Sequence, residues 1–165
     1  MGRGDNYKCK CCGNHFSVLY GVGMLYSHVC EEFLKDVKKG KYGEELKDLA
    51  ISRKDLAVGG QMDVFICESC NTWKNDYALG FYVPVDGVNV DVKPKNLIDV
   101  EMPVVWPYLL EEGYYKLLKG LTYKCPDCNK DMRLLAKDES YNFSCPRCKV
   151  KDCIDFEHMG FRKWD

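Results

Sequence analysis

Four pairs of cysteines, each with two residues between its members, constrain this sequence more than any other feature. The pairs are Cys9 with Cys12, Cys67 with Cys70, Cys125 with Cys128, and Cys145 with Cys148. A turn of this length directs two sulfurs toward one metal ion, and two such pairs complete a tetrahedral four-sulfur site. The sequence therefore predicts a chain whose folding depends on metal bound by cysteine.

Composition favours metal ligands over disulfides. Eleven cysteines occur among 165 residues, with 46% apolar residues, 30% charged residues and a net charge of −1. The first residues are polar, and no apolar run approaches the roughly 18 residues that a membrane helix needs. We therefore expect a cytoplasmic protein in a reducing compartment, where closely spaced cysteines usually bind metal.

The last two pairs predict a C-terminal zinc site formed by Cys125, Cys128, Cys145 and Cys148, with sixteen residues between the pairs. Asn129 follows one turn, where a left-handed backbone is often needed. Residues 132–136 and 141–143 are expected to pair as a hairpin. This segment resembles the zinc-ribbon fold group over roughly residues 121–150, and the resemblance implies a closed, structural site.

The first two pairs predict a second site formed by Cys9, Cys12, Cys67 and Cys70, with the strands before each pair side by side. Cys11 is an alternative ligand in place of Cys9 or Cys12. The pairs also resemble rubredoxin-like sites, so iron is an alternative here, although we expect zinc at both sites. Spacing does not separate these metals, because a tetrahedral four-sulfur site suits both.

Hydrophobic periodicity indicates an α+β protein. Helices are expected at residues 24–39, 43–50 and 108–119, and strands at 62–66, 77–83 and 88–92. The predicted domains are an N-terminal zinc-binding domain (1–93) with a helical insert at about 20–50, a linker with a short helix (94–120), and a C-terminal zinc ribbon (121–165). A further edge strand is expected near 97–100.

No catalytic motif accompanies the cysteine pairs, so we expect a non-enzymatic protein that binds a protein partner and no membrane. Cys11, Cys30 and Cys153 are left unpaired, with Cys30 buried in a helix. A nucleic-acid-binding ribbon is an alternative. It would use a basic stripe of Arg133, Lys137, Arg147, Lys149 and Lys151, although the net charge gives it little support. The order of turns, glycines and helix resembles uncharacterised bacterial zinc-ribbon proteins, a resemblance that implies no activity.

Overall fold

The computed structural model describes residues 2–86, 101–136 and 144–162, and the chain divides into two compact units. The cysteine unit comprises Met1–Gly21, Met62–Tyr77 and Thr122–Asp165, and the helical unit comprises Val22–Gln61 and Ala78–Leu121. The predicted boundary at residue 120 lies beside the change of unit between Leu121 and Thr122, and the predicted boundary at residue 93 lies outside the described residues. Each unit is assembled from segments far apart in the sequence, because strand pairing joins them.

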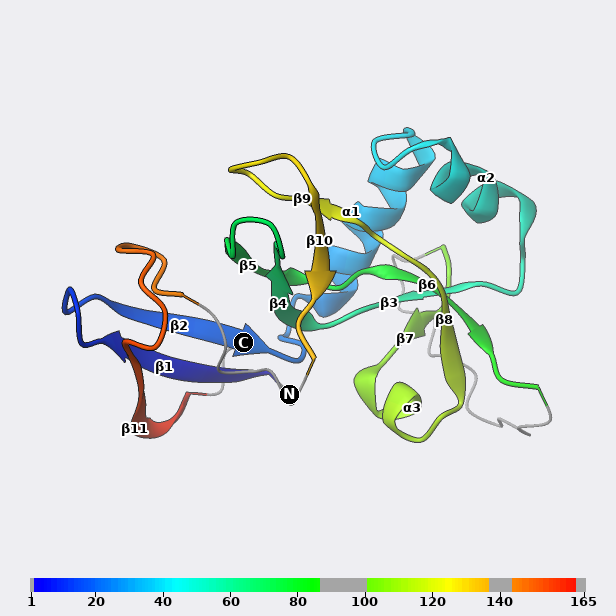
Figure 1. The fold of residues 1–165 in the computed structure, drawn as a ribbon. Coiled ribbons are helices and arrows are strands. Elements are labelled where there is room, and N and C mark those ends of the chain that lie inside the picture. Colours follow the sequence, from blue (N-terminus) through cyan, green and yellow to red (C-terminus); the bar gives the residue numbers. More distant parts are fainter. Residues whose placement is uncertain (1, 87–100, 137–143, 163–165) are drawn as a thin grey trace. The chain divides into compact units, whose positions relative to one another are not determined.

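The cysteine unit contains a three-stranded sheet with the order β11-β1-β2. Its strands are β1 (Arg3–Cys9), β2 (His15–Tyr20) and β11 (Ile154–Arg162). The central strand β1 pairs antiparallel with both neighbours, so Cys9 lies opposite Ile154 near the other end of the chain. Figure 1 shows the turn after β1 (blue) beside the segment that precedes β11 (orange).

A second sheet of the same unit has the order β5-β4-β10-β9. Its strands are β4 (Met62–Ile66), β5 (Trp73–Tyr77), β9 (Tyr123–Lys124) and β10 (Asp131–Leu134). The strands before Cys9 and Cys67, expected side by side, lie in different sheets, because β1 pairs with β2 and β11 and β4 pairs with β5 and β10. Residues 141–143 of the predicted C-terminal hairpin lie outside the described residues.

A small apolar core and a few polar contacts hold the two sheets of the cysteine unit together. The buried core residues are Tyr7, Val18, Val64, Ile66 and Leu135. The amide of Asn75 on β5 donates to the backbone oxygen of Leu19 on β2 at 2.8 Å and accepts from its N–H at 2.7 Å. Because this core is small among the described residues, we expect the unit to need additional cross-links.

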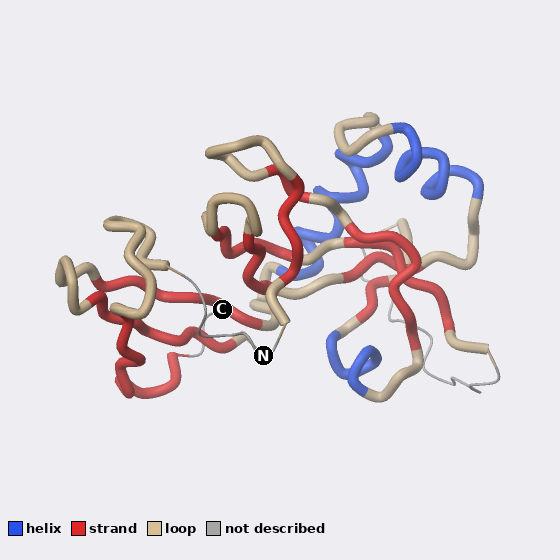
Figure 2. Tube along the Cα trace, viewed as in Figure 1, coloured by secondary structure: helices blue, strands red, loops and turns tan. Residues whose placement is uncertain are grey.

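The helical unit contains a sheet with the order β7-β3-β6-β8. Its strands are β3 (Ala57–Gly59), β6 (Gly80–Pro84), β7 (Val104–Val105) and β8 (Tyr115–Gly120), and its helices are α1 (Tyr26–Lys38), α2 (Glu44–Ser52) and α3 (Pro107–Glu111). Figure 2 shows the helices in blue and the strands in red. The buried hydroxyl of Tyr26 connects α1 to the sheet, because it donates to the Val105 oxygen at 2.7 Å and accepts from the Gly60 N–H at 2.9 Å.

Several predicted elements are confirmed, including the helices that become α1 and α2 and the strand that becomes β4. The helix expected over residues 108–119 is wrong beyond Glu111. Pro107 begins α3, and Gly113, with a φ of 73°, follows its end, so Tyr115–Gly120 is free to pair with β6. Residues 88–92 and 97–100 lie outside the described residues. No helix in the described ranges is long and apolar enough to cross a membrane.

Candidate metal centres

The eight paired cysteines form two groups of four, but the structure groups them differently from the sequence prediction. The terminal tetrad contains Cys9, Cys12, Cys145 and Cys148, and the middle tetrad contains Cys67, Cys70, Cys125 and Cys128. In each tetrad the four sulfurs lie within 4.8 Å of one another. The predicted grouping of the first pair with the second, and of the third with the fourth, is therefore wrong.

Strand pairing explains the grouping. The first pair sits in the turn between β1 and β2, and the fourth pair precedes β11, which pairs with β1. The second pair sits between β4 and β5, and the third sits between β9 and β10, which pairs with β4. Each tetrad therefore forms where two paired strands bring their adjoining turns together.

The four cysteine turns share one backbone geometry. In each turn the residue after the second cysteine donates its N–H to the carbonyl of the first cysteine, at 2.8–2.9 Å. The donors are Gly13, Asn71, Asn129 and Lys149, with φ values of 70°, 57°, 59° and 61°. The expectation that Asn129 adopts a left-handed backbone is confirmed, whereas Lys149 adopts it without the usual glycine or asparagine.

The distances between sulfurs of different turns in one tetrad suit a tetrahedral metal site. They are 3.6 Å for Cys9–Cys148, 3.7 Å for Cys12–Cys145, 3.4 Å for Cys67–Cys128 and 3.5 Å for Cys70–Cys125. A tetrahedron with metal–sulfur bonds of about 2.3 Å has edges of about 3.8 Å, whereas a disulfide needs about 2.05 Å. The sulfurs are thus spaced as ligands of a common ion.

The protonation of these thiols also favours a cation. In the terminal tetrad, burial by itself raises the pKa of Cys145. The backbone N–H groups of Cys148 and Arg147 have the larger combined effect in the opposite direction, so the pKa falls to about 6. The pKa of Cys12 rises to about 12, because burial and the neighbouring thiols outweigh the N–H of Asn14, which lowers it. Four thiols this close do not all ionise without a positive charge between them, and a divalent metal supplies it.

The tetrads differ in their access to solvent. The first cysteine of every turn is buried. The second cysteine is half-buried in the terminal tetrad, at Cys12 and Cys148, and exposed in the middle tetrad, at Cys70 and Cys128. A metal in the middle tetrad would therefore be the more accessible of the two to competing ligands.

Hydrogen bonds link the residues that flank the two tetrads. Ser144, just before Cys145, accepts at its carbonyl oxygen from the indole N–H of Trp73 at 2.6 Å. Lys151 donates to the side-chain oxygen of Asn71 at 2.8 Å. Asn71 and Trp73 follow the second cysteine pair, whereas Ser144 and Lys151 flank the fourth pair. These hydrogen bonds therefore hold the second and fourth turns near each other.

Two cysteines that the sequence left unpaired form a disulfide. Cys11 and Cys153 are bonded, with a Cα–Cα distance of 5.8 Å, so the expectation that both are unpaired is wrong. Cys11, the alternative ligand in the sequence prediction, is therefore engaged in the disulfide. The terminal tetrad contains Cys9 and Cys12, as their spacing predicted. Cys30 is buried in α1 as expected, and burial raises its pKa to about 12, which disfavours the nucleophilic thiolate.

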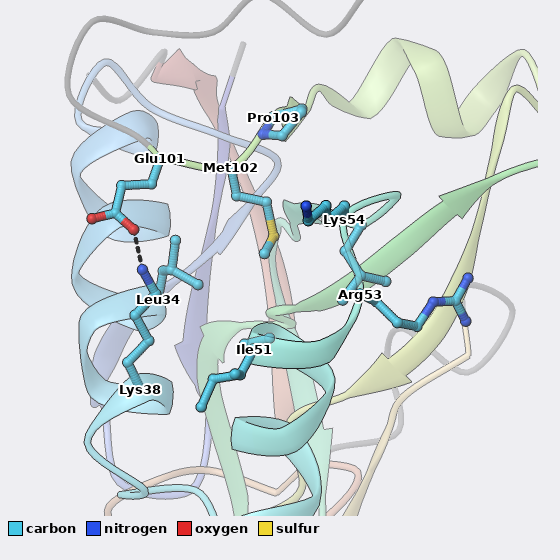
Figure 3. Close-up of a pocket in the computed structure, with 10 residues that line it drawn as sticks. Leu34, Lys38, Ile51, Arg53, Lys54, Glu101, Met102 and Pro103 are labelled. Atoms are coloured by element: carbon cyan, nitrogen blue, oxygen red, sulfur yellow. Dashed lines mark hydrogen bonds and ion pairs between the residues drawn. The ribbon is translucent and has the colours of Figure 1, made fainter.

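The helical unit has a separate cavity of about 280 Å³ between α1, α2 and the segment before β7 (Figure 3). Lys38 pairs with Glu101 across it, and the guanidinium of Arg53 points away from Met102 and pairs with Asp55. The lining residues include neither cysteine nor histidine.

Comparisons with known proteins give no family assignment: no family model, curated protein or solved structure matches this chain.

Proposed function

We propose that this chain is a non-enzymatic zinc protein, in which two four-cysteine sites hold together a scaffold that binds a protein partner. The observation that carries the metal proposal is the spacing of the sulfurs in two complete tetrads. Four cysteine ligands leave no open position at a tetrahedral metal for substrate or activated water. A structural role therefore suits these sites better than catalysis.

Metal would cross-link segments that the chain leaves far apart. Cys12 and Cys145 are separated by 133 residues, and Cys70 and Cys125 by 55. Closing such loops restricts the unfolded chain, so metal binding adds directly to the stability of the cysteine unit. This fits a unit whose main described apolar cluster consists of Tyr7, Val18, Val64, Ile66 and Leu135.

Analysis of the metal content of the purified chain tests the metal proposal. We expect two zinc ions per chain and no visible absorption. Iron with a strong thiolate-to-metal absorption band would instead support the rubredoxin-like alternative. Fewer than two tightly bound ions would refute the two-site proposal.

A protein partner is favoured over nucleic acid because many cations of the cysteine unit are already paired. The pairs are Lys10–Asp155, Lys124–Asp131 and Arg133–Glu68 at 2.6 Å, and Lys74–Asp76 at 2.7 Å. Arg133 belongs to the basic stripe considered from the sequence, and Lys137 lies outside the described residues. We expect no DNA or RNA binding even at low salt, where phosphate contacts are strongest.

The edge strand β8 is the part of the helical unit best suited to a protein partner. Two adjacent leucines on it are exposed, Leu117 by 55% and Leu118 by 39%. Within the described residues β6 pairs with one side of β8, and no strand pairs with the other. An open edge with apolar side chains favours an added strand from another protein.

Paired variants test this surface. Replacing Leu117 and Leu118 with lysine should abolish the specific capture of a partner while leaving the fold intact. Ile51→Lys is the matched control, because Ile51 is 66% exposed on α2. Equal capture by both variants would refute the assignment to β8, and no specific capture by the wild-type chain would refute the partner-binding role.

A further inference from the structure

Cys11 and Cys153 lie beside the terminal tetrad without belonging to it. Cys11 directly precedes the ligand Cys12, and the backbone N–H of Lys10 donates to the carbonyl of Cys153 at 2.7 Å. The next residue after Cys153 lies opposite Cys9 in the β1–β11 ladder. Any bond between Cys11 and Cys153 therefore acts on the turn that supplies two of the four ligands.

The disulfide and a metal in the terminal tetrad join the same two segments of the chain. The disulfide spans 142 residues, and the tetrad contact between Cys12 and Cys145 spans 133. Once the disulfide has closed this loop, metal binding no longer bears the entropy of closing it. The two cross-links therefore reinforce each other.

We propose that Cys11 and Cys153 form a reversible oxidation site that sets how tightly the terminal tetrad holds its metal. The disulfide form retains the metal, and the dithiol form releases it more readily. The proposal rests on the proposed function, because it requires metal in the terminal tetrad. It assigns a regulatory task to two cysteines that the metal sites leave unused.

The redox step uses a peroxide as oxidant and a dithiol as reductant. The exposed Cys11 thiolate attacks hydrogen peroxide, which breaks the O–O bond and gives a sulfenic acid and hydroxide, and the hydroxide takes up the proton released by the Cys11 thiol to become water. The Cys153 thiol then displaces the second water and forms the S–S bond. A dithiol reverses the reaction by thiol–disulfide exchange: it is oxidised to its own disulfide, and its two protons pass to Cys11 and Cys153, which become thiols again.

The remaining cysteines explain why this pair would respond selectively. In the metal-loaded chain the eight tetrad sulfurs would be bound to metal, and Cys30 is buried in α1 of the helical unit. The middle tetrad has no further cysteine pair beside it among the described residues. Oxidation and reduction of Cys11 and Cys153 should therefore change metal retention at the terminal tetrad and leave the middle tetrad nearly unchanged.

The test compares metal release from the zinc-loaded full chain in its disulfide form and after reduction with a phosphine that has no thiol. A chromogenic chelator records the release, and alkylation followed by mass spectrometry identifies the tetrad that each kinetic phase comes from. The disulfide removes the cost of loop closure from the metal-binding step. Its reduction should therefore weaken metal retention at the terminal tetrad by roughly 10- to 1,000-fold. The phase from the middle tetrad should change by less than about twofold, given the loop-closure origin of the effect.

Two variants separate this effect from general destabilisation. Cys11→Ser and Cys153→Ser should each behave like the reduced chain under oxidising conditions, with no further response to the phosphine. Cys30→Ala is the matched control and should keep the full redox response.

Equal release from both redox forms, or a response that survives in Cys153→Ser, would overturn the proposal while leaving the metal sites in place. A chain that carries no metal in the terminal tetrad at the start would overturn the proposed function as well. Metal content measured before the release experiment distinguishes the two failures.

Discussion

The grouping of the cysteines is the most decisive prediction, because sequence and structure give opposite answers. Replacing both Cys125 and Cys128 with serine removes half of the ligands of the middle tetrad. If Cys67 and Cys70 share that site, they lose their metal and become reactive. If instead Cys145 and Cys148 shared it, those two would become reactive.

The magnitude follows from the number of ligands removed. Structural zinc in small domains contributes about 10–16 kcal/mol, so losing two of four thiolates should cost about 5–8 kcal/mol, or roughly 10⁴- to 10⁶-fold in affinity. The metal content should therefore fall from two ions per chain to one in the presence of a moderate chelator. The terminal tetrad should retain its ion, since its four ligands are untouched.

Alkylation of the zinc-loaded variant, mapped by mass spectrometry, gives the answer residue by residue. We expect labelling of Cys67 and Cys70 and protection of Cys9, Cys12, Cys145 and Cys148. The reciprocal control, Cys145→Ser with Cys148→Ser, should expose Cys9 and Cys12 instead. Labelling of Cys145 and Cys148 in the first variant, with Cys67 and Cys70 protected, would refute the strand-based grouping.

Three further predictions concern the backbone and the metal. Lys149→Gly should stabilise the chain by about 1 kcal/mol, because the φ of 61° strains a side-chain-bearing residue; a chemical melt in which Lys149→Gly is no more stable than Lys149→Ala would contradict this. Gly60→Ala should destabilise the helical unit by about 2 kcal/mol or more, since its Cβ would lie 2.5 Å from the Ala78 oxygen. Its control is Gly113→Ala, whose Cβ would meet nothing within 4 Å and which should cost only about 1 kcal/mol when the two glycine variants are compared in a thermal melt. Removing metal with a strong chelator should abolish amide protection in β1, β4 and β10 while α1 keeps its protection, because both tetrads belong to the cysteine unit; equal loss in α1 would show that the helical unit also depends on metal.

Local features of the sequence were sufficient to predict which cysteines form the tetrads and where the longer helices lie. The spacing within each cysteine pair selects the turn, and glycine or asparagine after Cys12, Cys70 and Cys128 accommodates its left-handed residue. The helical periodicity of α1 and α2 depends on neighbours three and four residues apart, so it can be recognised in the sequence without knowledge of the tertiary structure. The strand β11 and the turn geometry at Lys149 carried no such local signal.

The partner of each cysteine pair was decided only by the tertiary structure. Two-residue spacing is identical in all four pairs, so it carries no information about which pairs meet, and proximity along the chain favoured the wrong grouping. Long-range pairing of β1 with β11 and of β4 with β10 sets the true one. The same pairing brings Cys153 to Cys11 across 142 residues. The sequence by itself thus determined which sulfurs could bind metal, and the strand order determined which of them are grouped in one tetrad.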